Sequence, residues 1–307
     1  MRKTCFNTIY ELAKLDPRVV FVGSDLGAGV LDDFKRDFPD RFFMEGVSEQ
    51  YLVGVSAGMA REGNIVYVAT VAAFITRRCF EQIVLDVGLH HANVKLISIG
   101  GGLVYTPLGP THLALDDIAL MRSVPGMTVT APADSVEMKQ LMYASLKHSG
   151  PMYIRLAKGG EQIVTADTKF IIGRAKLIKS GTDALVVTTG ITLQIALEAR
   201  EILFKKGLQV SIMHMPTVKP LDKQLLSKTV VKIPVIVTIE EHFLAGGLGS
   251  AISEFLSQKN LLSGRQFRIM AIADEFPGGY GSQSQQLAKF GLTASKLVKV
   301  IYGLCSK

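Results

Sequence analysis

Short apolar runs recur along the chain and alternate with amphipathic segments of helical length. The apolar runs lack regular polar alternation, which is typical of strands whose sheet is covered on both faces. Alternation of such strands with helices favours parallel α/β sheets. In the first half the predicted strands are 19–23, 65–69, 94–99, 127–130 and 152–156, and the predicted helices are 50–61, 78–91, 116–122 and 135–148.

A second series of elements begins after residue 160. Residues 161–169 are polar and are interpreted as a linker. The strands predicted beyond it are 184–189, 208–213 and 235–239, and the helices are 193–206, 249–258 and 294–303. We therefore predict two α/β domains with mainly parallel sheets flanked by helices, at residues 1–163 and 164–307.

Length and composition fit a globular protein. The 307 residues suffice for two domains, and 48% hydrophobic with 20% charged residues excludes disorder. No apolar run reaches the roughly 18 residues of a membrane span, and no signal-peptide pattern follows Met1. Three widely separated cysteines, Cys5, Cys79 and Cys305, favour a reducing compartment over disulfides or a zinc site. We predict a cytoplasmic protein that does not bind membranes.

The formal net charge of +7 raises the question of nucleic-acid binding. The lysines are scattered, however, and no basic run is interleaved with aromatic residues, so we expect no nucleic-acid partner. A mild basic excess fits anionic small substrates or an acidic protein partner equally well.

Three segments carry the candidate chemistry. Glu49 ends a Gly-Val-Ser-Glu run directly before the predicted helix 50–61, and Phe74 follows the predicted strand 65–69. A Gly-Pro-Thr-His loop at 109–112 places His112 near the carboxyl ends of the predicted strands. Together these segments resemble the pyrimidine-binding domain of transketolases. The second half, with its markers at 218–222 and 240–249, resembles the C-terminal domain of that family, so the resemblance covers almost the whole chain.

The resemblance implies thiamine diphosphate as the cofactor. In that family a glutamic acid donates a hydrogen bond to the cofactor's aminopyrimidine, and Glu49 matches that residue as both catalytic and cofactor-binding. Phe74 matches the aromatic ring that packs against the aminopyrimidine, and Phe80 either lines the same pocket or belongs to the core. Asp25 and Leu26 match a segment that borders the cofactor. Without the resemblance, Glu49 would be a helix-start carboxylate favoured by the helix dipole.

The resemblance also implies a substrate site. His112 matches a histidine that reaches the substrate's oxygens as a donor or proton shuttle. Arg155 matches an arginine that pairs with substrate phosphate, with a structural ion pair as the alternative. Arg77 stands where related deoxyxylulose-phosphate synthases carry a phosphate-binding arginine, with a surface or structural role as the alternative. His242 is expected to be structural.

One family signature is missing from the chain. Nothing matches the Gly-Asp-Gly…Asn-Asn signature that holds magnesium and the diphosphate in transketolases. A diphosphate needs a cation and backbone donors to hold it. Because the signature that supplies them is missing, this chain is expected to hold no metal. We predict the β-type subunit of a split enzyme, with Mg²⁺ held by a separate α-type subunit in a heterotetramer.

Two positions depart from the family pattern. Leu108 stands where relatives usually have an aspartate that reads a sugar hydroxyl, and Gly100 stands where transketolases place a histidine. Without these two polar side chains, we expect this chain to recognise the substrate's stereochemistry and its distal anion through other contacts than its relatives use. The glycine runs 100–102 and 278–281 do not follow a dinucleotide fingerprint and predict tight backbone packing.

The leading function is transfer of a two-carbon ketol unit from a ketose phosphate to an aldose phosphate. Rival functions are the β subunit of a 2-oxo-acid dehydrogenase, deoxyxylulose-phosphate-synthase-like transfer, and a non-catalytic scaffold that binds a partner subunit. The intact set of Glu49, Phe74 and His112 argues against the scaffold.

Overall fold

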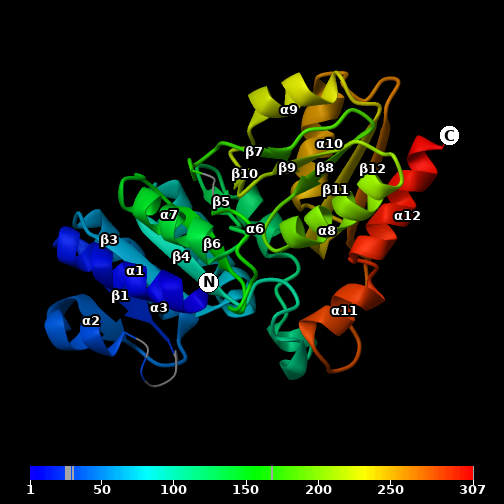
Figure 1. Cartoon of the computed structure of the whole chain (residues 1–307). Helices are drawn as coiled ribbons and strands as arrows, with labels where there is room; N and C mark the ends of the chain where they lie inside the picture. The colour runs from blue at the N-terminus through cyan, green and yellow to red at the C-terminus, as the bar shows by residue number, and fades with distance from the viewer. Residues whose placement is uncertain (25–28, 30, 167–168, 307) are drawn as a thin grey trace.

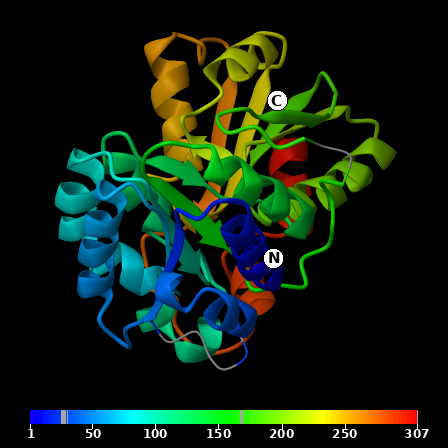
Figure 2. The same cartoon turned by 90° about the vertical axis from the view of Figure 1, so that its left-hand side faces the viewer.

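The computed structural model describes residues 1–24, 29, 31–166 and 169–306. Two mainly parallel sheets with flanking helices lie side by side, the first built mostly from the blue-to-green half of the chain (Figures 1 and 2). This architecture confirms the predicted fold class. Within the described part of the chain, none of the helices combines the length and apolar character needed to span a bilayer.

The first sheet has seven strands among the described residues, in the order β10-β5-β6-β4-β3-β1-β2. All of its neighbours are parallel except β10 and β5. The strands are β1 (Val19–Gly23), β2 (Phe42–Met44), β3 (Ile65–Val71), β4 (Val94–Ile99), β5 (Thr128–Thr130), β6 (Met152–Leu156) and β10 (Thr217–Lys219). Their helices are α1 (Arg2–Leu15), α2 (Asp32–Asp37), α3 (Glu49–Arg61), α4 (Ala72–Arg77), α5 (Phe80–Gln82), α6 (Asp117–Ser123) and α7 (Ser135–Leu146), with short 3₁₀ turns η1 (Pro39–Arg41), η3 (Thr106–Leu108) and η4 (Pro110–His112).

The second sheet has five strands in the described residues, in the order β12-β11-β8-β9-β7. Only the edge strand β7 runs antiparallel to its neighbour. The strands are β7 (Lys176–Lys179), β8 (Ala184–Thr188), β9 (Val210–His214), β11 (Val235–Phe243) and β12 (Gln266–Ile272). Their helices are α8 (Thr192–Lys205), α9 (Lys223–Val230), α10 (Leu248–Gln258), α11 (Gln283–Lys289) and α12 (Ala294–Cys305).

Strand β10 comes from the second half of the chain but completes the first sheet. It pairs antiparallel with β5, with Thr217 opposite Thr130. Lys219 extends this contact, since its Nζ donates to the carbonyl oxygens of Arg122 at 2.8 Å and Val124. The second half of the chain therefore contributes one strand to the first sheet. The boundary at residues 163 and 164 stays a prediction.

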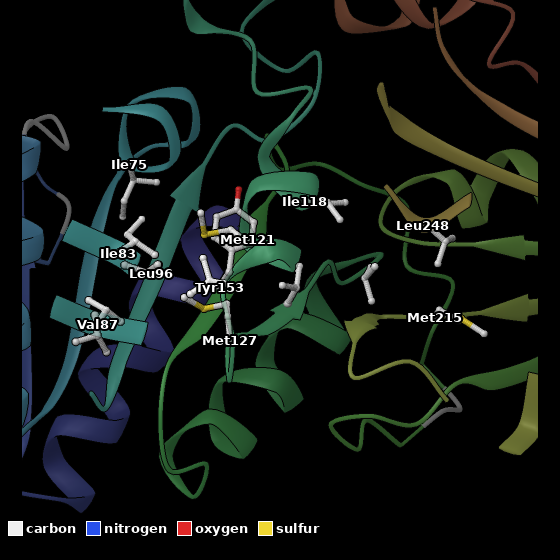
Figure 3. Packing of buried hydrophobic residues seen from close by; sticks show 14 of the residues in the cluster. Ile75, Ile83, Val87, Leu96, Ile118, Met121, Met127, Tyr153, Met215 and Leu248 are labelled. Atoms are coloured by element: carbon white, nitrogen blue, oxygen red, sulfur yellow. The ribbon is translucent and has the colours of Figure 1, made fainter. Parts of the chain in front are cut away.

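The apolar core is continuous across the two domains. One cluster of buried side chains extends from the α3 and β3 layers to strands and helices of the second domain. Figure 3 shows it running from Ile75 and Val87, past Tyr153, to Met215 and Leu248. Because burial of apolar surface contributes about 25 cal/mol per Å², the shared cluster resists separation of the domains.

Several elements match the sequence prediction, and others differ. Strands β1, β4 and β6 have the predicted bounds. The predicted helix 78–91 is instead divided into α5 and the π-helix η2 (Ile83–Leu89), after an irregular Cys79 with φ −105° and ψ 13°. Helix α1 was not predicted, although its buried residues Cys5, Ile9 and Leu12 recur at helical spacing.

A buried charge cluster joins the domains. Glu137 of α7 accepts a hydrogen bond from Lys176 Nζ of β7 at 2.7 Å, and its Oε2 lies 2.9 Å from His214 Nε2 of β9. Burial alone would raise the pKa of Glu137, but His214 and Lys176 hold it at about 2, below its ordinary value of 4.5. The cluster stabilises the folded chain as long as Glu137 is ionised.

Loss of the Glu137 charge is expected to destabilise the protein in a pH-dependent way. Because the pKa is depressed in the folded state, the stabilisation is present above about pH 4.5 and is lost as the pH falls towards 2. Urea unfolding should show Glu137→Gln less stable than the wild type by about 3 kcal/mol at pH 7, with a smaller difference at pH 3.

The matched control is Glu201→Gln, which removes an exposed carboxylate paired with Arg200 at 3.3 Å. This change should cost under about 1 kcal/mol. A difference between wild type and Glu137→Gln that stays constant from pH 7 to pH 3 would contradict the assignment.

Candidate active site

The carboxyl ends of β3 and β4 bring the candidate residues together. Phe74 lies in α4, which follows β3 directly, and His112 lies in η4 beyond β4. Their rings meet edge to face, with centroids 5.1 Å apart and an interplanar angle of 62°. The structure thus brings together two residues, separated by 38 positions, at one edge of a parallel sheet.

Glu49 is the first residue of α3, and its side chain is only 6% exposed. Arg78 supplies a counter-charge, since its Nη1 lies 3.2 Å from Glu49 Oε2. The same guanidinium lies over the ring of Phe74, with Cζ 3.9 Å from the centroid. The contacts therefore form a chain, in which each of four groups touches the next. They are the Glu49 carboxylate, the Arg78 guanidinium, the Phe74 ring and the His112 imidazole.

This arrangement fits a flat, nitrogen-rich ring. The Arg78 guanidinium is planar, carries N–H donors and contacts both the Glu49 carboxylate and the Phe74 face. A 4-aminopyrimidine is also flat, but its ring nitrogen accepts a hydrogen bond where the guanidinium donates one. A carboxyl group beside an aromatic face can donate that bond and pack against the ring, so the residues fit the cofactor that the sequence predicts. Among the described residues, no group of three His, Cys, Asp or Glu side chains is placed to hold a metal ion.

Cys79 lies beside this corner but offers no nucleophile. Burial, followed by the charge of Glu49, raises the pKa of its thiol to about 12. The thiol donates to the Phe74 carbonyl oxygen, with Sγ and O 3.6 Å apart. Its contribution is to hold the turn that follows α4.

Two cofactor-binding predictions gain little from the structure. Phe80 is partly buried and packs against the main apolar cluster, as its core alternative implies. A place for Phe80 in the cofactor pocket stays a prediction. Asp25 and Leu26 lie outside the described residues.

Arg77 links α4 to the loop that carries His112. Its Nε lies 2.9 Å from Asp116 Oδ2, and its Nη2 donates to the carbonyl oxygen of Leu113, the residue after His112. The side chain is still 37% exposed. Contact between Arg77 and a substrate phosphate stays a prediction.

Arg155 has a different environment from the one expected for a phosphate ligand. Its Nε and Nη2 bind Asp117 of α6 at 2.7 and 3.1 Å. Nη2 also donates to the carbonyl oxygens of Ala114 at 3.1 Å and Glu241 at 2.9 Å, and the side chain is 8% exposed. Because protein partners engage the guanidinium, this geometry supports the structural ion pair, and contact between Arg155 and a substrate phosphate stays a prediction.

The C-terminal domain holds the loop between β4 and His112, a role that the sequence did not reveal. Glu241 of β11 accepts hydrogen bonds from Leu103 N at 2.9 Å and Gln283 Nε2 at 2.7 Å. Burial raises the pKa of Glu241, although Arg155 and the two donors oppose the shift. The Glu-Glu-His run at 240–242 was the sequence signal available for this contact. It served only to recognise the C-terminal domain and did not predict a role for Glu241.

The glycine run 100–102 is explained by this close packing. A Cβ on Gly101 would lie 2.5 Å from Arg155 Cγ, and one on Gly102 would lie 2.4 Å from Glu241 Cδ. Gly102 also has φ +73°, a left-handed conformation that favours glycine. The run therefore lets the loop lie directly on two buried charged side chains.

The two departures from the family pattern have distinct surroundings. A Cβ on Gly100 would lie 2.1 Å from the Tyr105 ring, so no histidine fits there without moving that ring. Leu108 is 53% exposed and precedes Gly109, whose Cβ position would lie 3.1 Å from the Tyr280 ring. In both views the segment leading to α11 lies beside this loop (Figures 1 and 2).

Comparison with known families identifies the two domains. The model described as "Transketolase, pyrimidine binding domain" matches residues 1–160, and "Transketolase, C-terminal domain" matches residues 173–297. The chain belongs to the transketolase family. Both halves of the resemblance predicted from the sequence are thereby confirmed.

Individual relatives indicate the branch of the transketolase family. The chain is 34% identical over 301 residues to one subunit of the apulose-4-phosphate transketolase of Phocaeicola vulgatus, covering 97% of this chain and 95% of that protein. It is 37% identical to 1-deoxy-D-xylulose-5-phosphate synthase of Heliobacterium modesticaldum over 96% of its own length, but spans 45% of that enzyme. A solved structure titled "Split gene transketolase, inactive beta4 tetramer" superposes with a TM-score of 0.89 at 32% identity, covering 99% and 97% of the two chains. The chain therefore resembles the β-type subunits of split transketolases.

The structural assignment of Arg155 predicts a loss of stability on mutation. Lysine cannot reproduce the two-pronged contact with Asp117, so Arg155→Lys should lower the free energy of unfolding by about 2–4 kcal/mol in urea titrations. In the active assembly, its KM for a phosphorylated substrate should change by less than about twofold.

Arg77→Lys is the matched control, because Arg77 pairs with Asp116 at a half-exposed position. Its stability should change by under about 1 kcal/mol. A wild-type-like stability of Arg155→Lys, together with a large rise in KM for phosphorylated substrates, would favour the substrate role.

Proposed function

We propose that the chain is the catalytic β-type subunit of a split, thiamine-diphosphate-dependent transketolase. One observation carries the proposal: the buried Glu49 carboxylate and the Phe74 ring contact the same flat group, the Arg78 guanidinium. The imidazole of His112 lies next to the Phe74 ring. The proposed reaction transfers a two-carbon ketol unit from a ketose phosphate to an aldose phosphate. Similarity along nearly its full length to one subunit of another transketolase supports this assignment.

Each residue of the site has a defined task in this proposal. Glu49, carrying or sharing a proton, donates a hydrogen bond to the aminopyrimidine edge, which burial strengthens by excluding water. Phe74 holds the flat face of that ring in an apolar contact. His112 lies against the Phe74 ring, where its imidazole can donate to a substrate oxygen or carry its proton.

The cofactor completes the chemistry when it is bound. Thiamine diphosphate supplies the carbon nucleophile and the electron sink of the reaction. An α-type subunit is proposed to hold Mg²⁺ and the diphosphate, so that the site lies at the interface of a heterotetramer. Exposed apolar residues, Val47 just before α3 and Tyr51 in its first turn, support a protein contact near Glu49.

A second candidate function is transfer of the deoxyxylulose-phosphate-synthase type. The 37% identity to such an enzyme favours it, although the match spans 45% of that protein. In that case pyruvate would be a donor and ketose phosphates would not.

Decarboxylation of pyruvate coupled to an acyl carrier would instead indicate the 2-oxo-acid dehydrogenase alternative.

Removal of the Glu49 carboxyl tests the catalytic proposal. In the complex with its co-purified partner, Glu49→Ala should lower kcat by roughly 10²–10⁴, because one acid is lost from the reacting site. The measurement is ketol transfer over a panel of ketose phosphates and aldose phosphates. Equal rates for the wild type and Glu49→Ala would instead favour a scaffold.

Glu62→Ala is the control for this experiment. Glu62 caps the opposite end of the same helix, is exposed, and should leave kcat within about twofold of the wild type. Both variants are compared at equal occupancy of the partner subunit, so that a defect of assembly is not counted as a defect of chemistry.

The split-site proposal also predicts how the purified chain behaves alone. Without a partner, the diphosphate lacks its proposed anchor, so thiamine diphosphate with Mg²⁺ should bind at least about 100-fold more weakly than to the complex. Isothermal titration calorimetry of the chain and of the complex measures both constants. Tight binding to the chain alone would refute the split site.

A further inference from the structure

Arg78 occupies the space between the two groups assigned to the cofactor ring. Its Nη1 lies 3.2 Å from Glu49 Oε2, and its Cζ lies 3.9 Å from the centroid of Phe74. One flat side chain therefore contacts both the carboxylate and the aromatic face. A pyrimidine ring cannot make these two contacts while the guanidinium remains there.

The contact has a clear electrostatic reason in the free chain. The Glu49 side chain is 6% exposed, and a buried carboxylate without a partner is strongly unfavourable. Arg78 neutralises this charge and gains a cation–π contact with Phe74. The guanidinium thus satisfies Glu49 in the absence of any ligand.

Arg78 is free to leave this position without refolding the chain. Half of its side chain is exposed, and its backbone is held separately, because Gln50 Nε2 donates to the Arg78 carbonyl oxygen at 3.0 Å. The neighbouring Arg77 is bound by Asp116 and the Leu113 carbonyl oxygen. A change of rotamer of Arg78 alone would open the space.

We propose that Arg78 is an internal competitor, which occupies the aminopyrimidine position in the free chain and is displaced when the cofactor binds. The inference rests on the proposed function, since it assumes that Glu49 and Phe74 receive the cofactor. Displacement exchanges the ion pair of Glu49 with Arg78 for a hydrogen bond to the cofactor ring. Glu49 takes up from solvent, or shares with the ring, the proton that this bond requires, so the buried carboxyl group always has a partner. The exchange weakens cofactor binding by the free energy of the Arg78 contacts.

The proposal predicts opposite effects of one mutation on stability and on affinity. Arg78→Met removes the counter-charge of Glu49, so the melting temperature of the cofactor-free complex should fall by about 2–4 °C. It also removes the competitor, so the Kd for thiamine diphosphate with Mg²⁺ should fall roughly 3- to 30-fold. A residue that only supports the fold, or that binds the cofactor itself, would not tighten cofactor binding when removed.

The experiment uses the co-purified complex, with calorimetry to measure Kd and thermal unfolding to measure stability. Two further variants make it more specific. Arg78→Lys keeps the charge but loses the planar stack, so its Kd should lie between those of the wild type and Arg78→Met. Arg200→Met is the control, since Arg200 also contacts a carboxylate at 3.3 Å and lies 5.8 Å from a phenylalanine ring, in α8. Its Kd should equal that of the wild type.

Salt gives an independent test of the same competition. Because the ion pair is half exposed, raising the ionic strength should narrow the gap in Kd between the wild type and Arg78→Met. An unchanged or higher Kd for Arg78→Met, with a wild type that binds the cofactor, overturns this inference alone. If the wild-type complex binds no thiamine diphosphate, the proposed function fails, and the inference fails with it.

Discussion

The ion pair between Arg155 and Asp117 is the contact on which the architecture of the site depends. From β6, Arg155 reaches α6, the Ala114 carbonyl oxygen beyond His112, and the Glu241 carbonyl oxygen of the second domain. Tyr153 adds a hydroxyl that donates to Asp117 at 2.7 Å. Two buried charges are stable only when their remaining hydrogen-bonding groups are satisfied. Here that satisfaction requires the sheet, the loop and the second domain to come together.

The second domain supports the loop of the candidate site. Glu241 holds the backbone at Leu103, and Gln283 holds Glu241 in turn. The loop that ends at His112 is thereby fixed at both sides, by Glu241 near its start and by Arg77 near its end. A site that must hold its geometry benefits from such support, because small displacements of reacting groups cost large factors in rate.

The sequence predicted the parts of the structure that depend on local pattern. Strand β6 was found at its full length, since a fully buried strand is a continuous apolar run. Strand β10 was missed, because three residues carry no period and their partner β5 lies 87 positions earlier. The substrate role of Arg155 came from the resemblance and stays a prediction, whereas its protein contacts could not be predicted. Its partners, Asp117 and Glu241, are distant in sequence, and the resemblance named the residue but not its surroundings.

The place of β10 in the first sheet limits how this polypeptide could be divided or recombined. If the chain were cut within 161–169, the N-terminal fragment would lack β10 and would expose the edge of β5, while the C-terminal fragment would carry β10 without its sheet. Unpaired sheet edges promote aggregation. Joining another polypeptide to either end of this chain would leave the pairing of β10 with β5 intact, whereas a break between the two domains would destroy it. The two domains would therefore be inherited as one module.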